Sequence, residues 1–437
     1  MKLAGRLASF VLPLSLVQTP LAAQPRPAPE ASSTDLALMQ GIMSDAGYQA
    51  ALAAMEQEHD RWVDNIIALT QVPAPPFKES ARAALYAQKF RELGLSDVEI
   101  DEEGNVLGLR RGTGAPGGKL VIVSAHLDSV FPEGTDTTVR REGERLYAPG
   151  VGDDATGLAT QLSIINAMNE AHIQTPSDIL FVGTVGEEGL GDLRGMRYLF
   201  TNGRYKDRAS AFFSIDGTSS TDFTSGGVGS KRYKLTFRGP GGHSFGAFGL
   251  VNPMSAMAQA VVGLYDIPVP ASPKTTYSAS VVSGGTSINA IPREIVLQVD
   301  MRSESAGELA KMEQAFLAAV DAAVAAENQA RSTAEGAVSV ERELVGDRPA
   351  GTTPDTAAIV GYASAAYRVR GISPRISSGS TDSNVPMSLG IPALTIPRAA
   401  DGGRGHSVDE WIDIERAPSI RIKALDLAVI LATAGMR

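Results

Sequence analysis

Three short apolar runs, two of them separated by a helical pattern, constrain the fold of this chain most strongly. They are KLVIVSAHLD (119–128), DILFVGTV (178–185) and ASAFFSID (209–216), each of a length typical of a buried strand. Between the first two, ATGLATQLSIINAMNE (155–170) has apolar residues at helical spacing. Strands that alternate with helices predict an α/β fold around a mostly parallel, mixed sheet.

A different pattern begins after residue 226. Strand-like and helical segments follow one another in the order β-α-β-β-α-β, at 231–239, 251–265, 275–284, 293–302, 304–329 and 337–345. This order is that of a ferredoxin-like α+β domain. We therefore predict a catalytic domain in two parts, 46–226 and 347–437, with an inserted domain at 227–346.

The N-terminus has the organisation of an export signal. Lys2 and Arg6 precede an apolar run, and small residues follow it. The run is too short to cross a bilayer, so we predict a signal peptide over residues 1–23 and a secreted or periplasmic protein without stable membrane insertion. The Pro/Ala/Ser-rich composition that follows predicts a flexible linker at 24–45.

Composition excludes several classes of function. The chain has 437 residues, of which 43% are hydrophobic and 20% charged, as in a soluble enzyme with an ample core. A net charge of −10 argues against nucleic acid as the main partner. The absence of cysteine excludes thiolate metal sites, cysteine nucleophiles and disulfides.

Histidine or carboxylate side chains follow each of the three apolar runs. His126 ends the first run, Glu187 and Glu188 follow the second, and Asp216 ends the third. In open α/β sheets, functional groups gather beyond the carboxyl ends of the strands, so a shared site is expected. Asp128, two residues after His126, lies on the same side of an extended chain and can fix the imidazole tautomer. A purely structural histidine–aspartate pair is the alternative.

Two glycine-rich segments carry further candidates. Asp153 and Asp154 lie in APGVGDDATG, which opens a helix, and His406 lies in DGGRGHSVDEW. The remaining histidines outside glycine-rich contexts, His59 and His172, are expected at the solvated surface.

The adjacent carboxylates of Glu187 and Glu188 repel each other unless a positive charge lies near them. Because successive side chains point apart, Glu188 could bind a cation while Glu187 faces the water bound to that cation. Such a water ionises near neutral pH. Glu187 could accept its proton and deliver it to a leaving amine.

These segments together resemble the M20 metallopeptidases, which include peptidase T-like aminopeptidases, glutamate carboxypeptidases and N-acyl amino acid deacylases. The matching segments occur in family order and cover nearly all of the chain after the linker. They are HLD, GVGDDATG, GEEG, SID, GPGGHSFG, GGTSINAIP, DMR, GSTDSN and GHSVDEW.

The resemblance implies two metal ions, commonly zinc, although cobalt or manganese would suit the same ligands. Asp153 would bridge the ions. His126 and Asp216 would complete one site, and Glu188 and His406 the other.

The resemblance also assigns roles to the neighbouring residues. Asp128 would orient His126, and Glu187 would be the general base. The Asp153–Asp154 peptide is expected to be cis.

The inserted domain would, by the same resemblance, mediate formation of a homodimer and act as a lid. His243 would reach the partner's active site and stabilise the oxyanion, with Asn289 nearby. Arg302 would hold a substrate carboxylate with its planar fork. Asn289 as a turn cap and Arg302 as an interdomain salt bridge are the structural alternatives.

We therefore predict a metal-dependent exopeptidase that hydrolyses short peptides, with GEEGLGDLRGMRYLF and GVGDDATG closest to peptidase T-like aminopeptidases. A carboxypeptidase or an N-acyl amino acid deacylase is the alternative, since a carboxylate-binding arginine serves all three. A more distant alternative is a serine hydrolase that uses Ser244 in GHSFG, although no helix follows that motif immediately. A non-catalytic protein that retains the fold is another.

Overall fold

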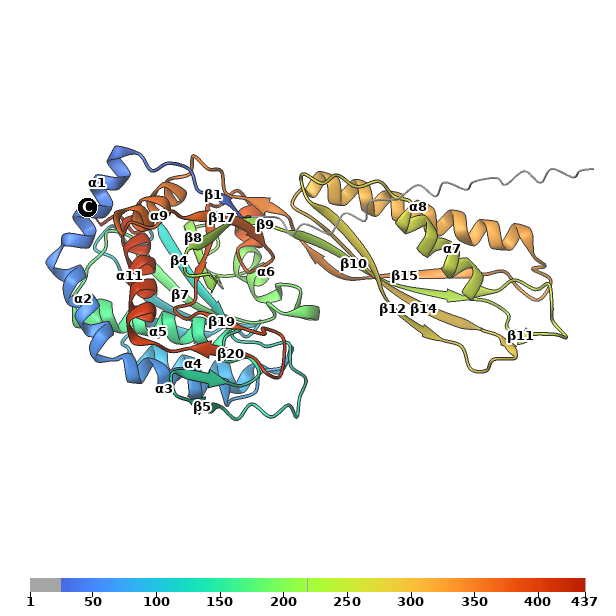
Figure 1. The fold of residues 1–437 in the computed structure, drawn as a ribbon, viewed down its shortest axis with the longest axis horizontal. Helices are drawn as coiled ribbons and strands as arrows, with labels where there is room; N and C mark the ends of the chain where they lie inside the picture. Colours follow the sequence, from blue (N-terminus) through green and yellow to red (C-terminus); the bar gives the residue numbers. More distant parts are fainter. Residues whose placement is uncertain (1–24, 218, 437) are drawn as a thin grey trace, which may run out of the picture.

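The computed structural model describes residues 25–217 and 219–436. A large α/β part carries an elongated α+β part that extends from one side (Figure 1). The predicted signal peptide, 1–23, lies outside the described residues. Among the helices that are described, none combines the length and the apolar character needed to cross a membrane.

A ten-stranded mixed sheet forms the centre of the large part. Its strands are β1 (Arg26–Pro27), β2 (Ser96–Ile100), β3 (Val106–Arg110), β4 (Leu120–His126), β7 (Asp178–Thr184), β8 (Ala209–Gly217), β9 (Asp222–Gly227), β16 (Gly351–Thr352), β17 (Arg375–Gly379) and β18 (Ala393–Pro397). The order is β1-β17-β9-β18-β8-β4-β7-β3-β2, with β16 beside β9. β7, β4, β8 and β18 run parallel to one another. The predicted α/β class and mostly parallel centre are confirmed.

Helices cover both faces of this sheet. They are α1 (Ser33–Ser44), α2 (Ala46–Gln57), α3 (His59–Thr70), α4 (Ser80–Glu92), α5 (Ala155–Glu170), α6 (Arg194–Thr201), α9 (Ala358–Val369), α10 (Asn384–Ser388) and α11 (Arg416–Thr433). Val121 and Val123 of β4 belong to one apolar cluster, and Leu120 and Ile122 to another. Because alternate side chains point to opposite faces, a strand buried on both sides reads as a continuous apolar run.

The predicted linker at 24–45 is wrong for most of its length. β1 pairs with β17, Ala28 is buried, and α1 occupies Ser33–Ser44. The side chain of Ser32 caps α1, and α1 packs against α9 and α11 through buried Met39 and Ile42. The Pro/Ala/Ser composition concealed this cap and the helical spacing of the apolar residues that follow it.

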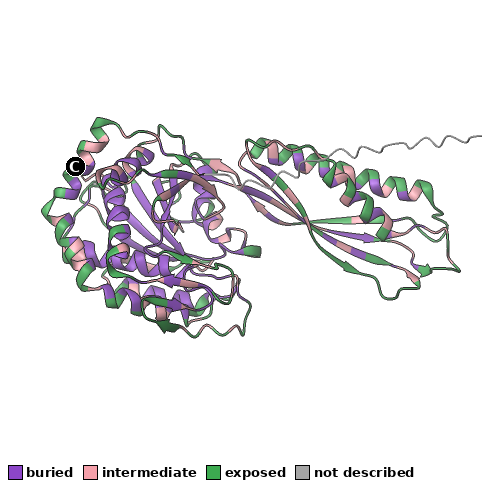
Figure 2. Ribbon diagram, in the orientation of Figure 1, coloured by how far each residue is buried: buried purple, intermediate pink, exposed green. Residues whose placement is uncertain are grey.

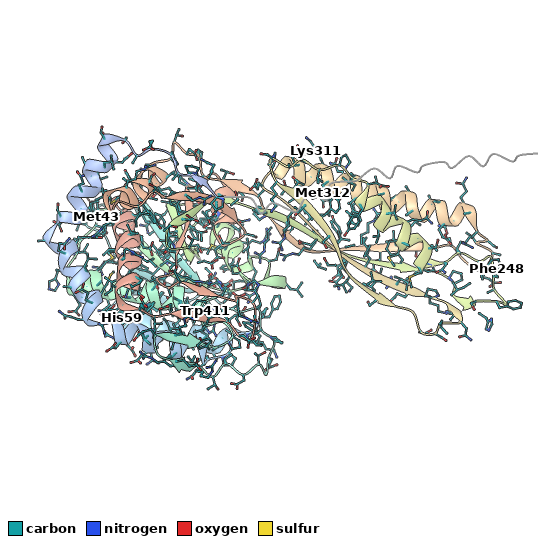
Figure 3. The ribbon with its side chains drawn as sticks, in the orientation of Figure 1. Met43, His59, Phe248, Lys311, Met312 and Trp411 are labelled. Atoms are coloured by element: carbon teal, nitrogen blue, oxygen red, sulfur yellow. The ribbon has the colours of Figure 1, made fainter. Side chains whose placement is uncertain are left out.

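One of the two histidines expected at the surface is buried instead. His59 is 4% exposed, and its Nε2 lies 2.9 Å from the carbonyl oxygen of Ile414. Figure 3 labels His59 among the helices of the large part. His172 is exposed, as expected.

The small part, residues 229–348, has its own sheet and core. Its elements are β10 (Gly229–Arg238), α7 (Pro253–Tyr265), β12 (Thr275–Gly284), β14 (Glu294–Ser303), α8 (Ala306–Ala330) and β15 (Ser339–Arg348). The antiparallel order is β12-β14-β10-β15, and both helices pack on one face. This element order confirms the predicted ferredoxin-like unit. Exposed residues dominate the surface of the small part (Figure 2).

Two minor sheets complete the fold. β5 (Arg140–Glu142), β6 (Arg145–Tyr147), β19 (Gly402–Gly403) and β20 (Trp411–Asp413) form one, and β11 (Gly242–His243) pairs with β13 (Ala290–Ile291) at the far end of the small part. The guanidinium of Arg145 lies 4.3 Å from the ring centroid of Trp411. The first sheet joins the segment before Asp153 to the segment around His406.

Candidate metal centre

The large sheet brings the predicted ligands to one edge. His126 is the last residue of β4, Glu188 lies four residues after β7, and Asp216 is near the end of β8. These three strands are parallel neighbours, so their carboxyl ends meet. Asp153 reaches the same edge from the loop before α5, and His406 from the loop after β19.

The five side chains form two groups that share Asp153. One group contains His126, Asp153 and Asp216, and the other contains Asp153, Glu188 and His406; within each, the candidate ligand atoms lie within 4.8 Å of one another. Nε2 of His126 is 2.9 Å from Oδ1 of Asp153. Nε2 of His406 is 3.2 Å from Oδ2 of Asp153 and 3.1 Å from Oε1 of Glu188. These groups coincide with the two metal sites implied by the sequence resemblance.

The charges in this cluster are those of a cation site. Burial and the charge of Asp153 raise the pKa of Asp216 to about 7. Hydrogen bonds to Asp153 and Glu188 raise the pKa of His406 to about 10. The carboxylates can therefore all be ionised at the same time only if positive charge lies beside them. Two imidazoles and three carboxylates suit zinc, manganese or cobalt, so the residues present fit a pair of divalent ions.

Asp128 supports the cluster in a different way from the one expected. Nδ1 of His126 lies 3.0 Å from the carbonyl oxygen of Asp128, but 3.7 Å from its carboxylate. That carboxylate instead accepts hydrogen bonds from the backbone N–H groups of Glu187 (3.0 Å) and Glu188 (2.8 Å). Burial opposes ionisation of Asp128, but these contacts and His126 hold its pKa below the usual range. Asp128 therefore positions the two glutamates as well as the imidazole.

Asp154 ties the start of α5 to β4. Its carboxylate accepts from the backbone N–H of Gly157 and from that of His126, both at 3.1 Å. A Cβ atom at residue 157 would lie 2.1 Å from the carbonyl oxygen of Ile215, so only glycine allows α5 to begin this close to β8. The Asp153–Asp154 peptide is cis, as the resemblance implied.

Two buried residues beside Asp153 were not predicted from the sequence. Oε1 of Glu410 accepts from the backbone N–H of Asp153 at 3.0 Å, and Oε2 accepts from Gly150 at 2.7 Å. Nη1 of Arg398 lies 3.4 Å from Oδ1 of Asp153. Glu410 belongs to the GHSVDEW segment and was quoted without a role, whereas no sequence pattern marks Arg398.

Glu187 is held by an arginine from the small part. Nη1 of Arg348, at the end of β15, donates to Oε1 of Glu187 at 3.1 Å, and its Nη2 donates to the carbonyl oxygen of the same residue. Burial raises the pKa of Glu187, Arg348 opposes this rise, and Glu188 adds to it. Glu187 is thus a buried carboxylate at the cluster with a raised pKa, as a general base requires.

The segment that carries this cluster matches a known family. Residues 122–429 match the model of peptidase family M20/M25/M40. The chain belongs to this family. It is therefore a hydrolase of the peptidase type.

Solved structures share the fold of this M20 peptidase. Aminopeptidase PepT from Bacillus cereus is 21% identical with a TM-score of 0.67, and the match covers 85% of this chain and 98% of that one. The di-peptidase Dug1p from Saccharomyces cerevisiae is 16% identical with a TM-score of 0.70, covering 89% and 98%. The YXEP protein of Bacillus subtilis, a dinuclear metal-binding peptidase of the M20 family, is 15% identical with a TM-score of 0.61, covering 86% and 99%.

A cavity of about 540 Å³ lies beside the metal-ligand cluster of this M20 peptidase. Arg302 lines it together with Glu187, Glu188 and Asp216. The ion pair of Arg302 is with Asp300 on its own strand, Nε to Oδ2 at 2.7 Å, rather than between domains. Arg302 is therefore available at the site where a substrate carboxylate was expected.

His243 and Asn289 lie away from the cluster of their own chain. Both are exposed, His243 in β11 and Asn289 directly before its partner strand β13, at the tip of the small part (Figure 1). Nδ1 of His243 accepts from the backbone N–H groups of Phe245 and Gly246, and Oδ1 of Asn289 accepts from Ser287 at 2.6 Å. Their action in a partner's site stays a prediction.

The segment around Ser244 lacks the geometry of a serine nucleophile. The strand before it, β11, has only two residues, and α7 begins nine residues later, at Pro253. A nucleophile elbow needs a strand that turns directly into a helix. The structure therefore does not favour the serine hydrolase alternative.

Proposed function

We propose that this protein is a metal-dependent exopeptidase of short peptides, with a peptidase T-like aminopeptidase reaction favoured. The observation that carries the proposal is the Asp153 carboxylate, which has His126 at one oxygen and His406 at the other. Asp216 completes the first group and Glu188 the second. This arrangement supports two divalent ions, zinc being the first choice and cobalt or manganese alternatives.

Divalent ions bound here would supply an acidified water as the nucleophile and offset the negative charge of the carboxylates. Glu187 belongs to neither of the two groups that share Asp153, although its carboxylate also lies within 4.8 Å of ligand atoms of His126 and Glu188. We assign this carboxylate as the base that takes a proton from the attacking water. The raised pKa of Glu187 then suits delivery of that proton to the leaving amine. Arg348 keeps the Glu187 carboxylate aimed at the cluster.

The proposal is tested first by substrate class. Purified protein is assayed with free-N-terminus di- and tripeptides, with N-blocked peptides and with N-acyl amino acids, with and without added zinc. Zinc-dependent release of the N-terminal residue from the free peptides is expected. Activity confined to N-acyl amino acids would replace the aminopeptidase proposal by the deacylase alternative, and removal of C-terminal residues from N-blocked peptides would replace it by the carboxypeptidase alternative.

The role of Glu187 is tested by a matched pair of substitutions. Glu187→Gln is expected to lower kcat by about 10²–10⁴-fold, because the base is lost, with zinc content unchanged. Glu188→Gln is expected to lower zinc content, because a ligand is lost. Unchanged hydrolysis by zinc-loaded Glu187→Gln protein would contradict the assignment of the base.

We also propose that the protein is exported, on the strength of the N-terminal sequence, and that it acts as a homodimer in which His243 stabilises the oxyanion in the partner's site. The exposure of His243 at the tip of the small part is compatible with a contact between chains. Fractionation of expressing cells tests the first proposal.

A further inference from the structure

Most of the residues that line the cavity beside the metal-ligand cluster carry charged or hydroxyl groups. Among the described residues that line it, Val130 is the only one with a hydrocarbon side chain. Serine and threonine side chains contribute hydroxyl groups, and Arg232, Arg302 and Arg348 contribute guanidinium groups. The carboxylates of the metal-ligand cluster and of Glu187 line the same cavity. Such a wall fits a polar or anionic side chain of a substrate better than a large apolar one.

Two of these arginines come from adjacent strands of the small part. Arg232 on β10 is directly opposite Asp300 on β14, and Arg302 lies two residues beyond Asp300. Residues in these positions share one face of a sheet. Buried Met301 points to the opposite face, where α7 and α8 pack, so the two arginines and Asp300 occupy the face without helices.

Asp300 holds both guanidiniums. Its Oδ1 accepts from Nε of Arg232 at 3.1 Å, and its Oδ2 accepts from Nε of Arg302 at 2.7 Å. Arg232 also donates from Nη1 to the carbonyl oxygen of Gly189 at 2.9 Å. This hydrogen bond holds Arg232 next to the segment that carries Glu187 and Glu188. Within the described part of the chain, Nη2 of Arg232 and both terminal nitrogens of Arg302 have no hydrogen-bond partner.

The charge of this group is unbalanced. Two guanidiniums share one carboxylate, so the group formed by Arg232, Arg302 and Asp300 has one net positive charge. Arg348 differs, because Glu187 already neutralises it. An arginine whose terminal nitrogens are unpaired is the preferred partner of a carboxylate.

We propose that Arg232 and Arg302, oriented by Asp300, bind the two carboxylates of a dicarboxylic residue at the C-terminus of the substrate. One guanidinium takes the C-terminal carboxylate and the other takes the side-chain carboxylate. This inference rests on the proposed peptidase function and narrows it to peptides or N-acyl amino acids that end in aspartate or glutamate. Arg232 is the residue that adds selectivity to the carboxylate binding expected of Arg302 alone.

The test is a ratio of specificity constants. Zinc-loaded protein is assayed with Ala-Glu, Ala-Gln and Ala-Leu, and with N-acetylglutamate and N-acetylglutamine. The wild-type protein is expected to show a kcat/KM for the glutamate substrate at least about tenfold above that for its glutamine analogue, since a charge-assisted hydrogen bond is lost in the analogue. The substitution Arg232→Gln is expected to bring this ratio close to one, and Arg232→Lys to give an intermediate ratio.

Arg238→Gln is the matched control. Arg238 lies on the same strand and face as Arg232 and pairs with Glu294 and Glu341, but it is six residues, about 20 Å, further along β10. This variant is expected to keep both the rate and the ratio of the wild-type protein. A wild-type ratio near one, or an Arg232→Gln ratio equal to that of the wild type, would overturn the proposal.

A binding measurement separates this proposal from the proposed function. If the wild-type protein hydrolyses no peptide or N-acyl amino acid, the proposed function fails. Calorimetry with L-glutamate and L-glutamine then tests separately whether Arg232 and Arg302 bind a dicarboxylate. Preference for glutamate in the wild type that is lost in Arg232→Gln supports the site. Equal binding of the two amino acids to the wild type overturns it.

Discussion

Three of the predicted ligands, His126, Asp153 and Glu188, are held by residues that do not belong to either ligand group. Asp128 accepts from the backbone at Glu187 and Glu188, and Glu410 accepts from the backbone at Asp153. Such contacts fix the direction of a ligand before an ion arrives, which reduces the cost of ordering the site. The strength of metal binding is therefore set partly by these supporting residues.

Glu410→Gln tests whether a supporting residue contributes to the strength of metal binding. The substitution keeps the size of the side chain but replaces one of its two acceptor oxygens by an N–H₂ group, which cannot accept from the backbone at Gly150 or Asp153. Zinc affinity, measured by competition with a chelator, is expected to fall about 10–100-fold. Asp409→Asn is the control, because the Asp409 carboxylate is exposed and pairs only with Arg404 among the described residues. Equal zinc affinities for Glu410→Gln and the wild type would contradict the account.

The ligands and one support, Asp128, could be predicted from the sequence, whereas the other supports could not. His126, Glu188 and Asp216 follow apolar runs, and the parallel arrangement of such strands brings their ends together. Arg348 and Arg398 follow no comparable pattern, because their positions depend on how distant segments meet. A direction of hydrogen bonding, such as that of the Asp128 carboxylate, likewise depends on tertiary contacts.

At the scale of elements, α11 carries a buried charge into the helical layer. Nζ of Lys423 lies 3.2 Å from Oγ of Ser163 and 4.8 Å from the ring centroid of Trp62. Glu58 accepts from the same serine at 2.6 Å. Burial lowers the pKa of Lys423 to about 8, although Glu58 opposes the change.

This pKa predicts how stability depends on pH. Between about pH 8 and the ordinary lysine pKa, the unfolded chain binds more protons at Lys423 than the folded chain does, so the free energy of unfolding rises with pH. Relative to Lys423→Met, the wild type is expected to gain roughly 1–3 kcal/mol across this window, measured by denaturant titration at several pH values. The exposed Arg421→Met variant should follow the wild type. Parallel stability curves for the wild type and Lys423→Met would refute the buried-lysine account.

Element types were predictable where the apolar period was regular. β4, β7 and β8 are continuous apolar runs and the long α8 has apolar residues at helical spacing, whereas β1 and α1 lie in a segment whose composition resembles a linker. Pairing with β17 and packing against α9 give that segment its structure. His59 was wrongly predicted at the surface for a similar reason. Its neighbours in the sequence are polar and give no sign of its contact with the carbonyl oxygen of Ile414.

At the scale of the whole molecule, the small part presents an unpaired sheet edge. β12 is the outer strand of its sheet, and Val281 and Val282 on it are 45% and 55% exposed. Exposed apolar edge strands pair readily with another chain. This edge is consistent with the homodimer that we propose.

Light scattering after gel filtration tests the dimer. The wild type is expected at twice the chain mass of 45.7 kDa, less any cleaved signal peptide, and the double substitution Val281→Lys/Val282→Lys at the mass of one chain, because like charges would face each other across the edge. Leu344→Lys, on the opposite edge strand β15, is the control. A wild-type protein that remains monomeric at micromolar concentration would contradict the proposed assembly.

The central claim is that the large sheet holds two divalent ions that share Asp153, at the carboxyl ends of β4, β7 and β8. Anomalous diffraction at the zinc absorption edge, from crystals of zinc-loaded protein, measures this directly. The account predicts two peaks per chain on either side of the Asp153 carboxylate, one beside His126 and the other beside His406. A map with no peak at this carboxylate, or with zinc bound only elsewhere on the chain, would contradict it.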